Sequence, residues 1–202
     1  MSRRPLFLHV GASKTGTSAL QRGLWRSTDA LAAAGVGVPL VGRPAHVRRL
    51  LQPLGWVAAQ GFVEPVRPRR LRKLARDVRA APGDRVLISS EDLCELDHDR
   101  VERLAELSER ADTELSVVLT ARSWDRQLPS EYQQFLKHRL DASYQPWLDD
   151  VRHRRGRWAE HFWWRQDVAA IAERFAAVVG PQRVHVLVSP SRPLDAGTTL
   201  FC

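Results

Sequence analysis

Cysteine is scarce in this sequence, and long apolar runs are missing. The 202 residues include two cysteines, Cys94 and Cys202, which lie far apart in the chain. Neither a disulfide framework nor a cysteine-based zinc site is therefore indicated. Arg or Asp interrupts every stretch with helical spacing before it reaches the roughly 18 apolar residues that a membrane-spanning helix needs. We expect a cytoplasmic protein without a membrane segment.

A secretion signal, an internal repeat and a linker rich in glycine and serine are missing as well. The apolar run that starts at Pro5 stops at Gly11, which is too short for a signal peptide. With 44% hydrophobic residues, a chain of this size can bury about 70% of its unfolded surface in one core. We therefore expect residues 1–202 to form one domain.

Lysine is rare, but arginine is not. Only Lys14, Lys73 and Lys137 accompany the arginines among 31 basic residues, which against 23 acidic residues give a net charge of +8. A basic balance favours anionic ligands, although scattered arginines also form ordinary solvated surface. No basic stripe interleaved with aromatic residues is present, so we expect no nucleic-acid partner.

Short apolar runs alternate with stretches of helical periodicity along the chain. The runs that predict strands are 5–10, 84–89, 115–121 and 183–188, and residues 35–39 predict a short strand or an extended turn. The predicted helices are 17–34, two or three short helices within 43–79, then 99–110, 124–139 and 166–179. This alternation predicts an α/β fold, a three-layer αβα sandwich around a mainly parallel sheet. Ligands of such sheets bind beyond the carboxyl ends of the strands.

A glycine-containing loop, residues 11–18, joins the first predicted strand to the first predicted helix and is called the glycine loop below. Its sequence is Gly-Ala-Ser-Lys-Thr-Gly-Thr-Ser. Free backbone N–H groups and the helix dipole make such a position suitable for an anion. A nucleoside-triphosphatase loop carries its lysine directly after the second glycine, where this chain has Thr17. A P-loop kinase is therefore disfavoured. The structural alternative is a glycine turn capped by Thr17 or Ser18.

The lysine inside the loop and a later arginine resemble a known family. The loop resembles the P-K-[ST]-G-T-[ST] segment of sulfotransferases, with Ser13 in place of the usual proline. Arg122 follows the predicted strand 115–121, and Ser130 lies eight positions later, which is similar to the R-x7-S segment of that family. The likeness is to bacterial members, and it implies a P-loop-like fold.

The resemblance implies a nucleotide donor, 3′-phosphoadenosine 5′-phosphosulfate, and no metal. It also implies the residues that hold this donor, namely Ser13, Lys14, Thr15, Gly16, Thr17 and Ser18 around the phosphosulfate and Arg122 and Ser130 at the 3′-phosphate. A guanidinium can fork onto two phosphate oxygens, and a hydroxyl adds a donor.

Sulfuryl transfer also needs a group that neutralises the leaving phosphate and a base that takes the acceptor's proton. Lys14 fits the first role, and Glu91, directly after the predicted strand 84–89, fits the second. The alternative for Glu91 is that it caps the next helical turn with its neighbours. His9 is expected to be a packed core residue. So is the aromatic cluster of Trp158, Phe162, Trp163 and Trp164.

Two departures from the family pattern affect the functional prediction. Ala19 stands where many sulfotransferases have a tryptophan that stacks on adenine, and the sequence stops at Cys202, before the helices and basic segment that usually follow the late strand. We therefore expect the fold to lack its C-terminal part. The predicted function is sulfuryl transfer to a hydroxyl-bearing small molecule or carbohydrate, and the alternative is a non-catalytic nucleotide-binding relic.

Overall fold

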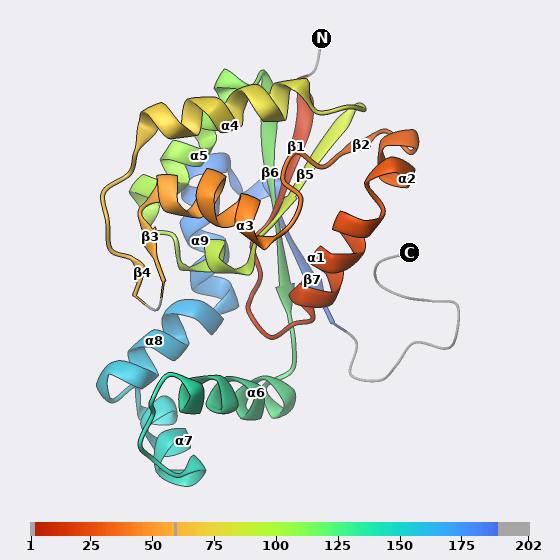
Figure 1. Cartoon of the computed structure of the whole chain (residues 1–202). Helices are drawn as coiled ribbons and strands as arrows, with labels where there is room; N and C mark the ends of the chain where they lie inside the picture. The colour runs from red at the N-terminus through yellow and green to blue at the C-terminus, as the bar shows by residue number, and fades with distance from the viewer. Residues whose placement is uncertain (1–2, 59, 190–202) are drawn as a thin grey trace.

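A computed structural model describes residues 3–58 and 60–189 and contains a five-stranded sheet (Figure 1). The order across the sheet is β2-β5-β1-β6-β7, and every neighbouring pair is parallel. The strands are β1 (Arg4–His9), β2 (Val36–Gly37), β5 (Arg85–Ser89), β6 (Thr113–Ala121) and β7 (Val184–Val188). The parallel sheet and the α/β class predicted from the sequence are confirmed.

Helices connect the strands and cover the sheet. They are α1 (Thr17–Arg26), α2 (Thr28–Ala33), α3 (Arg43–His46), α4 (Pro68–Ala80), α5 (His98–Arg110), α6 (Trp124–Lys137), α7 (Tyr144–His153), α8 (Gly156–Gln166) and α9 (Val168–Val179). The short helical turns are η1 (Val47–Leu51), η2 (Gln52–Leu54), η3 (Glu91–Glu95) and η4 (Pro181–Arg183). Figure 1 shows α1 and α2 on one side of the sheet and α4, α5 and α9 on the other.

The main hydrophobic core lies between the sheet and α4, α5 and α9. Alternate residues of β1, such as Leu6 and Leu8, are buried there together with apolar residues of β5 and β6. In α4 the buried positions are Leu71, Leu74, Ala75 and Val78. Their spacing of three and four residues places them on one side of the helix, which leaves the other side for charged residues.

Helices α6, α7 and α8 form a separate group below the carboxyl ends of the strands (Figure 1). They enclose a second, aromatic core around Phe135, Trp147 and Phe162, with Trp158 and Trp163 packed against it. The prediction of core positions is confirmed for these members of the aromatic cluster. It is wrong for Trp164, which is exposed. The Trp164 indole N–H donates to the Glu95 carbonyl oxygen, and the Arg174 guanidinium lies over its ring.

Several predicted boundaries need correction. The single helix expected over 17–34 is divided at Ser27 into α1 and α2, because Ser27 leaves helical geometry. Within 43–79, where two or three short helices were predicted, the structure adds an antiparallel pair, β3 (Trp56–Val57) and β4 (Gly61–Phe62). The last helix starts at Val168 rather than at residue 166, because Asp167 caps it by accepting from the Ala170 N–H. In residues 3–58 and 60–189, no helix combines the length and the hydropathy of a membrane span.

Candidate functional site

Three adjacent strands deliver the candidate residues to one edge of the sheet. The glycine loop follows β1, and Arg122 directly follows β6. Glu91 follows β5 after one intervening residue, Ser90. Because β5, β1 and β6 are neighbours and parallel, their carboxyl ends lie side by side. The structure therefore brings these segments together, as the sequence predicted.

The glycine loop exposes its backbone donors. Lys14 and Gly16 have φ angles of 64° and 94°, which turn the chain tightly into α1, and glycine adopts this left-handed conformation without strain. The turn begins α1 without a side-chain cap, so the alternative of a capped glycine turn is wrong. Among the described residues, no acceptor takes the N–H groups of residues 13–18. Such free N–H groups at a helix N-terminus form an anion-binding arrangement.

A chain of buried hydrogen bonds supports the loop from the sheet. Thr15 Oγ1 donates to the Ala12 carbonyl oxygen at 2.7 Å and lies 2.6 Å from Thr120 Oγ1. His9 Nε2 lies 3.3 Å from the same Thr120 oxygen. On the other side of the ring, His9 Nδ1 lies 2.7 Å from Ser89 Oγ. Thr120 Oγ1 also donates to the Gly11 carbonyl oxygen at 2.9 Å. Since each hydroxyl has one proton, the consistent assignment is that Ser89 donates to His9 Nδ1, His9 Nε2–H donates to Thr120, and the two threonine hydroxyls each donate to a loop carbonyl oxygen.

In this assignment His9 is neutral, with Nδ1 as acceptor and Nε2–H as donor. Burial lowers the pKa of His9 from 6.5 to about 4, because a charged imidazolium loses its hydration inside the protein. The side chain is 3% exposed. The prediction that His9 is a packed, hydrogen-bonded residue is therefore confirmed.

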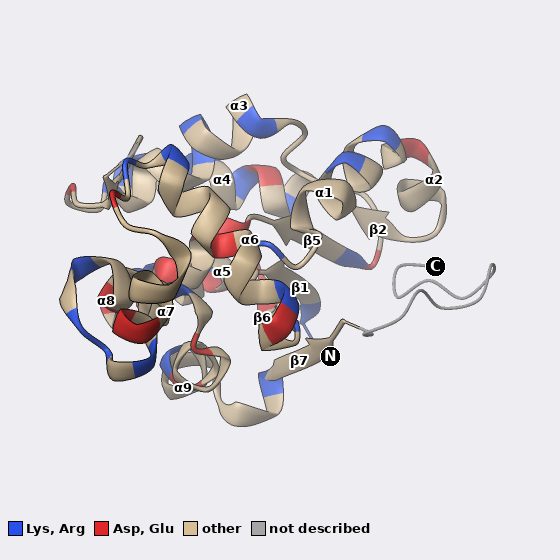
Figure 2. Ribbon diagram, turned by 90° about the horizontal axis from the view of Figure 1, so that it is seen from below, with Lys and Arg blue, Asp and Glu red and all other residues tan. Residues whose placement is uncertain are grey.

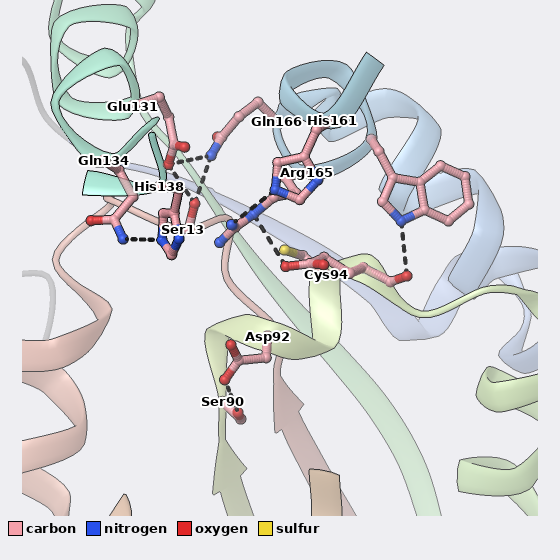
Figure 3. Close-up of polar contacts among 12 residues, drawn as sticks. Ser13, Ser90, Asp92, Cys94, Glu131, Gln134, His138, His161, Arg165 and Gln166 are labelled. Carbon is pink, nitrogen blue, oxygen red and sulfur yellow. Dashed lines mark hydrogen bonds and ion pairs between the residues drawn. The ribbon is translucent and has the colours of Figure 1, made fainter. Parts of the chain in front are cut away.

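A second buried network holds the loop from the helical group. Ser13 Oγ donates to Glu131 Oε1 at 2.6 Å, and Gln166 Nε2 lies 2.7 Å from Ser13 Oγ and 2.9 Å from Glu131 Oε1. Gln127 Nε2 donates to the Ser13 carbonyl oxygen at 2.6 Å and to Gln166 Oε1 at 2.7 Å. Figure 3 shows Ser13, Glu131 and Gln166 converging. We call Ser13, Gln127, Glu131 and Gln166 the loop network.

The two networks limit what the loop side chains can contribute. The hydroxyls of Ser13 and Thr15 point into the protein and are already paired. Only their backbone N–H groups remain for a ligand. By contrast, Gly16 and Ser18 are exposed, and Lys14 is partly exposed and has no ion-pair partner in the part of the chain that is described.

Arg122 lies against the glycine loop. Its Nη1 donates to the Lys14 carbonyl oxygen at 3.0 Å, so the two cationic residues belong to one surface. Ser130 is half-buried in α6. It lies three residues after Gln127 and next to Glu131, which both point toward the loop, and helical spacing therefore puts it on the flank of the same side. In the described part of the chain Arg122 donates to the Lys14 carbonyl oxygen and not to Ser130, which leaves the pairing of Arg122 with Ser130 a prediction.

Glu91 also reaches the loop. Its Oε2 accepts a hydrogen bond from the Thr17 hydroxyl at the start of α1. Ser90, at the N-cap of η3, makes no side-chain cap, and its hydroxyl lies 3.4 Å from Asp92 Oδ2. The alternative that Glu91 only caps the next turn is therefore not supported, since its carboxylate faces the loop.

Buried contacts from α8 and α9 hold the turn that carries Glu91. Arg165 Nε lies 3.2 Å from Glu95 Oε1 in a largely buried ion pair, and Arg174 donates to the Cys94 carbonyl oxygen at 2.7 Å. Burial raises the pKa of Glu95, an effect that Arg165 opposes. Burial also raises the pKa of the Cys94 thiol to about 12, so this thiol is not a reactive nucleophile.

The sequence analysis missed the residues that support the site from behind. Glu131, Gln127 and Thr120 were not singled out, although Gln127 and Glu131 are four residues apart and adjoin the Arg122–Ser130 segment. Two polar residues at that spacing mark a polar stripe on one side of a helix. This stripe is the sequence pattern that could have identified Gln127 and Glu131. Gln166 gave none, because its partners lie far away in the sequence.

Comparison with known proteins bears on the fold. No family model matches the sequence, and no curated protein matches it either. The solved structures include a sulfotransferase from Alicyclobacillus acidocaldarius that resembles this chain with a TM-score of 0.55 at 20% sequence identity. The match covers 92% of this chain and 73% of that one. The chain therefore has a sulfotransferase-type fold, as its loop and its Arg122 segment predicted.

Proposed function

We propose that this chain, whose fold is of the sulfotransferase type, transfers a sulfuryl group from 3′-phosphoadenosine 5′-phosphosulfate to a hydroxyl of a small molecule or carbohydrate. The observation that carries the proposal is the meeting of Lys14, Arg122 and Glu91 around one loop. Arg122 contacts the Lys14 main chain, and Glu91 contacts Thr17. Each residue comes from the end of a different strand.

The residues around the loop fit a donor with two separated anionic groups. The N–H groups of residues 13–18 would hold the phosphosulfate end, with Lys14 and the hydroxyl of Ser18 beside them. Arg122, with Ser130, would hold the 3′-phosphate, because a guanidinium matches two phosphate oxygens. A loop whose backbone is fixed by buried hydrogen bonds loses little entropy when the ligand binds.

The transfer follows an in-line displacement. The acceptor oxygen forms a bond to sulfur while the bond between sulfur and the bridging phosphate oxygen breaks, and the electron pair of that bond stays on the phosphate. Lys14 would stabilise the negative charge that grows there. Glu91 would take the acceptor's proton, since a carboxylate directly beside the loop can reach a hydroxyl aligned with the sulfur.

Calorimetry with 3′,5′-adenosine bisphosphate tests the donor site first. We expect binding without a metal, and no comparable binding of ATP with Mg²⁺. Lys14→Ala should weaken the binding of the bisphosphate. Lys137→Ala, which removes an exposed lysine at the end of α6, should leave this binding unchanged. Preference for ATP with Mg²⁺ would contradict the proposal.

Turnover of the donor tests the reaction separately. We expect Glu91→Gln to lower kcat for sulfuryl transfer by about 100-fold or more, as removal of a general base does, while bisphosphate affinity changes little. Glu109→Gln removes a carboxylate at the end of α5, away from the loop, and serves as the control. Tight bisphosphate binding with no turnover on any hydroxyl acceptor would instead identify a non-catalytic nucleotide-binding protein.

A further inference from the structure

The excess positive charge of this protein is confined to one segment. Residues 43–80 contain ten Lys or Arg and two Asp or Glu, which gives a net charge of +8. The whole chain also has a net charge of +8. Outside this segment 21 basic and 21 acidic residues balance. The basic character is therefore not a uniform consequence of arginine-rich composition, since composition alone would spread the excess along the chain.

These cations gather around a pocket between η1 and α4. The pocket has a volume of about 410 Å³ and is lined by two apolar residues, Pro53 and Leu74, and by six basic ones, Arg48, Arg49, Arg69, Arg70, Lys73 and Arg76. We call it the basic pocket. Pro53 and Leu74 are buried and form its floor, while five of its six cationic residues are exposed. In Figure 2, basic positions recur on the ribbon around α3 and α4.

The geometry of α4 explains the gathering. Its apolar residues face the core, and Arg69, Lys73 and Arg76 follow one another at spacings of four and three residues on the outer side. Side chains at such spacings are neighbours on a helix, and like charges there are destabilising. A helix that keeps several cations adjacent therefore gains stability from an anion that lies between them.

The protein itself supplies almost no counter-charge. Within the described ranges, Arg49 is the one lining residue with an ion-pair partner, Asp77. Arg48, Arg69, Arg70, Lys73 and Arg76 have no carboxylate within ion-pair distance in the same ranges. By contrast, arginines elsewhere, such as Arg155 and Arg165, pair with nearby carboxylates.

The pocket is distinct from the glycine loop. No residue that lines it belongs to the loop or to the Arg122 segment. In Figure 1, α4 lies at the upper end of the molecule, whereas the chain between β1 and α1 turns at the lower end, near α6. A ligand in the basic pocket is therefore not the donor proposed above, and the inference does not depend on that proposal.

We propose that the basic pocket binds a compact oxyanionic ligand that carries two or more phosphate or sulfate groups. Arginine predominates among its cations, and guanidinium groups pair with tetrahedral oxyanions through two parallel hydrogen bonds. The concave shape favours a small multivalent ligand or a headgroup over an extended polymer, whose charges would need a longer track. The apolar floor gives the carbon or ring portion of such an ester a place to pack.

Titration calorimetry with inorganic tripolyphosphate as the probe tests the proposal. The double variant Arg70→Gln/Lys73→Gln removes two pocket cations and keeps good helix formers on α4. The matched control is Lys137→Gln/Arg152→Gln, which removes one lysine and one arginine from exposed positions of α6 and α7. We expect the pocket variant to bind tripolyphosphate about 10-fold or more weakly, since each charge-assisted contact contributes substantially to affinity. The control variant should change this affinity by less than about twofold.

Two results would overturn the proposal. Equal losses in the pocket and control variants would mean that net charge alone attracts the probe. Loss of tripolyphosphate binding when 3′,5′-adenosine bisphosphate saturates the protein would mean that the probe occupies the glycine loop. Unchanged bisphosphate binding in Arg70→Gln/Lys73→Gln is expected, so that failure of the pocket and failure of the donor site are distinguishable.

Further arms of the experiment identify the source of the ligand. Binding to vesicles that contain a phosphoinositide with several phosphate groups, displaced by tripolyphosphate, would support a lipid headgroup, and the absence of vesicle binding would support a free phosphate or sulfate ester. Binding of a single-stranded oligonucleotide that tripolyphosphate does not displace would overturn the compact ligand in favour of a nucleic acid.

Discussion

The glycine loop and the basic pocket both suit anions, but their sources of attraction differ. The loop contains one cationic side chain, Lys14, and presents free N–H groups, while buried neutral and acidic groups fix it from two sides. The pocket is lined by six cations, five of them exposed, and among the residues that the structure describes only Arg49 has an ion-pair partner. The loop is rigid and weakly charged, whereas the pocket is highly charged and adaptable.

This difference has a physical consequence for recognition. Preorganised N–H donors discriminate between ligands by shape, because they cannot follow a misplaced oxygen. Long cationic side chains rearrange easily and respond mainly to charge, which salt screens. We therefore expect the loop to depend on its buried supports and the pocket to depend on ionic strength.

The largest expected effect comes from removing the acidic member of the loop network. Glu131 is fully buried and accepts from Ser13 and Gln166. Glu131→Ala leaves these donors without their acceptor in the interior, so we expect the free energy of unfolding to fall by about 3 kcal/mol. Urea denaturation measures it, and bisphosphate binding should weaken as the loop loses its support.

Two control variants test whether the loss of stability is specific to the Glu131 carboxylate. Glu131→Gln keeps an acceptor oxygen at nearly the same place and should lose less stability than the alanine variant. Gln133→Ala, at an exposed position of the same helix, should change the free energy of unfolding by less than about 0.5 kcal/mol. If Glu131→Ala were as mild as Gln133→Ala, the loop network would not support the loop.

The buried hydrogen bonds of His9, which also support the loop, predict that the stability of the fold decreases in acid. Burial lowers the pKa of His9 to about 4, below its value of about 6.5 in the unfolded chain. Between these values the unfolded state binds a proton that the folded state does not, so stability falls as the pH falls. From about pH 7.5 to about pH 5, His9 should account for a loss of about 2 kcal/mol.

Thermal or urea unfolding of His9→Gln at several pH values isolates this contribution. The variant should be less stable at neutral pH, yet its stability should depend less on pH than that of the original protein. His185→Gln, which changes an exposed histidine of β7, should leave the slope unchanged. A pH dependence that is identical in His9→Gln would show that His9 is not held neutral by the fold.

The smallest effect concerns salt, and it sharpens the contrast between the two anion sites. Raising the salt concentration from about 50 mM to about 200 mM should weaken tripolyphosphate in the basic pocket severalfold, as expected where several cations displace counterions. Bisphosphate binding at the loop should weaken by about twofold, because neutral backbone N–H donors displace few counterions when the ligand binds. Calorimetric titrations at both salt concentrations give the ratio, and equal losses would remove the distinction.

The elements that the sequence predicted well are those with strong local signals. All five strands of the parallel sheet were placed near their observed bounds, because β-branched runs such as 115–121 leave little ambiguity. The β3–β4 pair was missed, since each strand has only two residues, and such pairing depends on tertiary contacts. Helices α7 and α8 were not predicted either, and the aromatic residues of α7 are covered because α6 and α8 pack beside them.

For the candidate site, the sequence predicted the residues that gather at the glycine loop better than the residues that support the loop. Lys14, Arg122 and Glu91 follow strand ends, a position that topology makes functional. The partners Glu131, Gln166 and Thr120 act through contacts between segments more than 30 residues apart in the chain. No local pattern encodes such contacts. Ser13 illustrates the limit, because it was predicted to hold the donor, whereas its hydroxyl joins the loop network.

We propose that Arg122 and the glycine loop bind the two ends of one nucleotide. The decisive measurement compares the affinities of 3′,5′-adenosine bisphosphate and adenosine 5′-monophosphate for the original protein and for Arg122→Ala. We predict that Arg122→Ala weakens the bisphosphate by about 2 kcal/mol, the contribution of a charge-assisted contact, and leaves the monophosphate nearly unchanged. Equal weakening of both nucleotides would contradict the account, because Arg122 would then only position the loop through the Lys14 carbonyl oxygen.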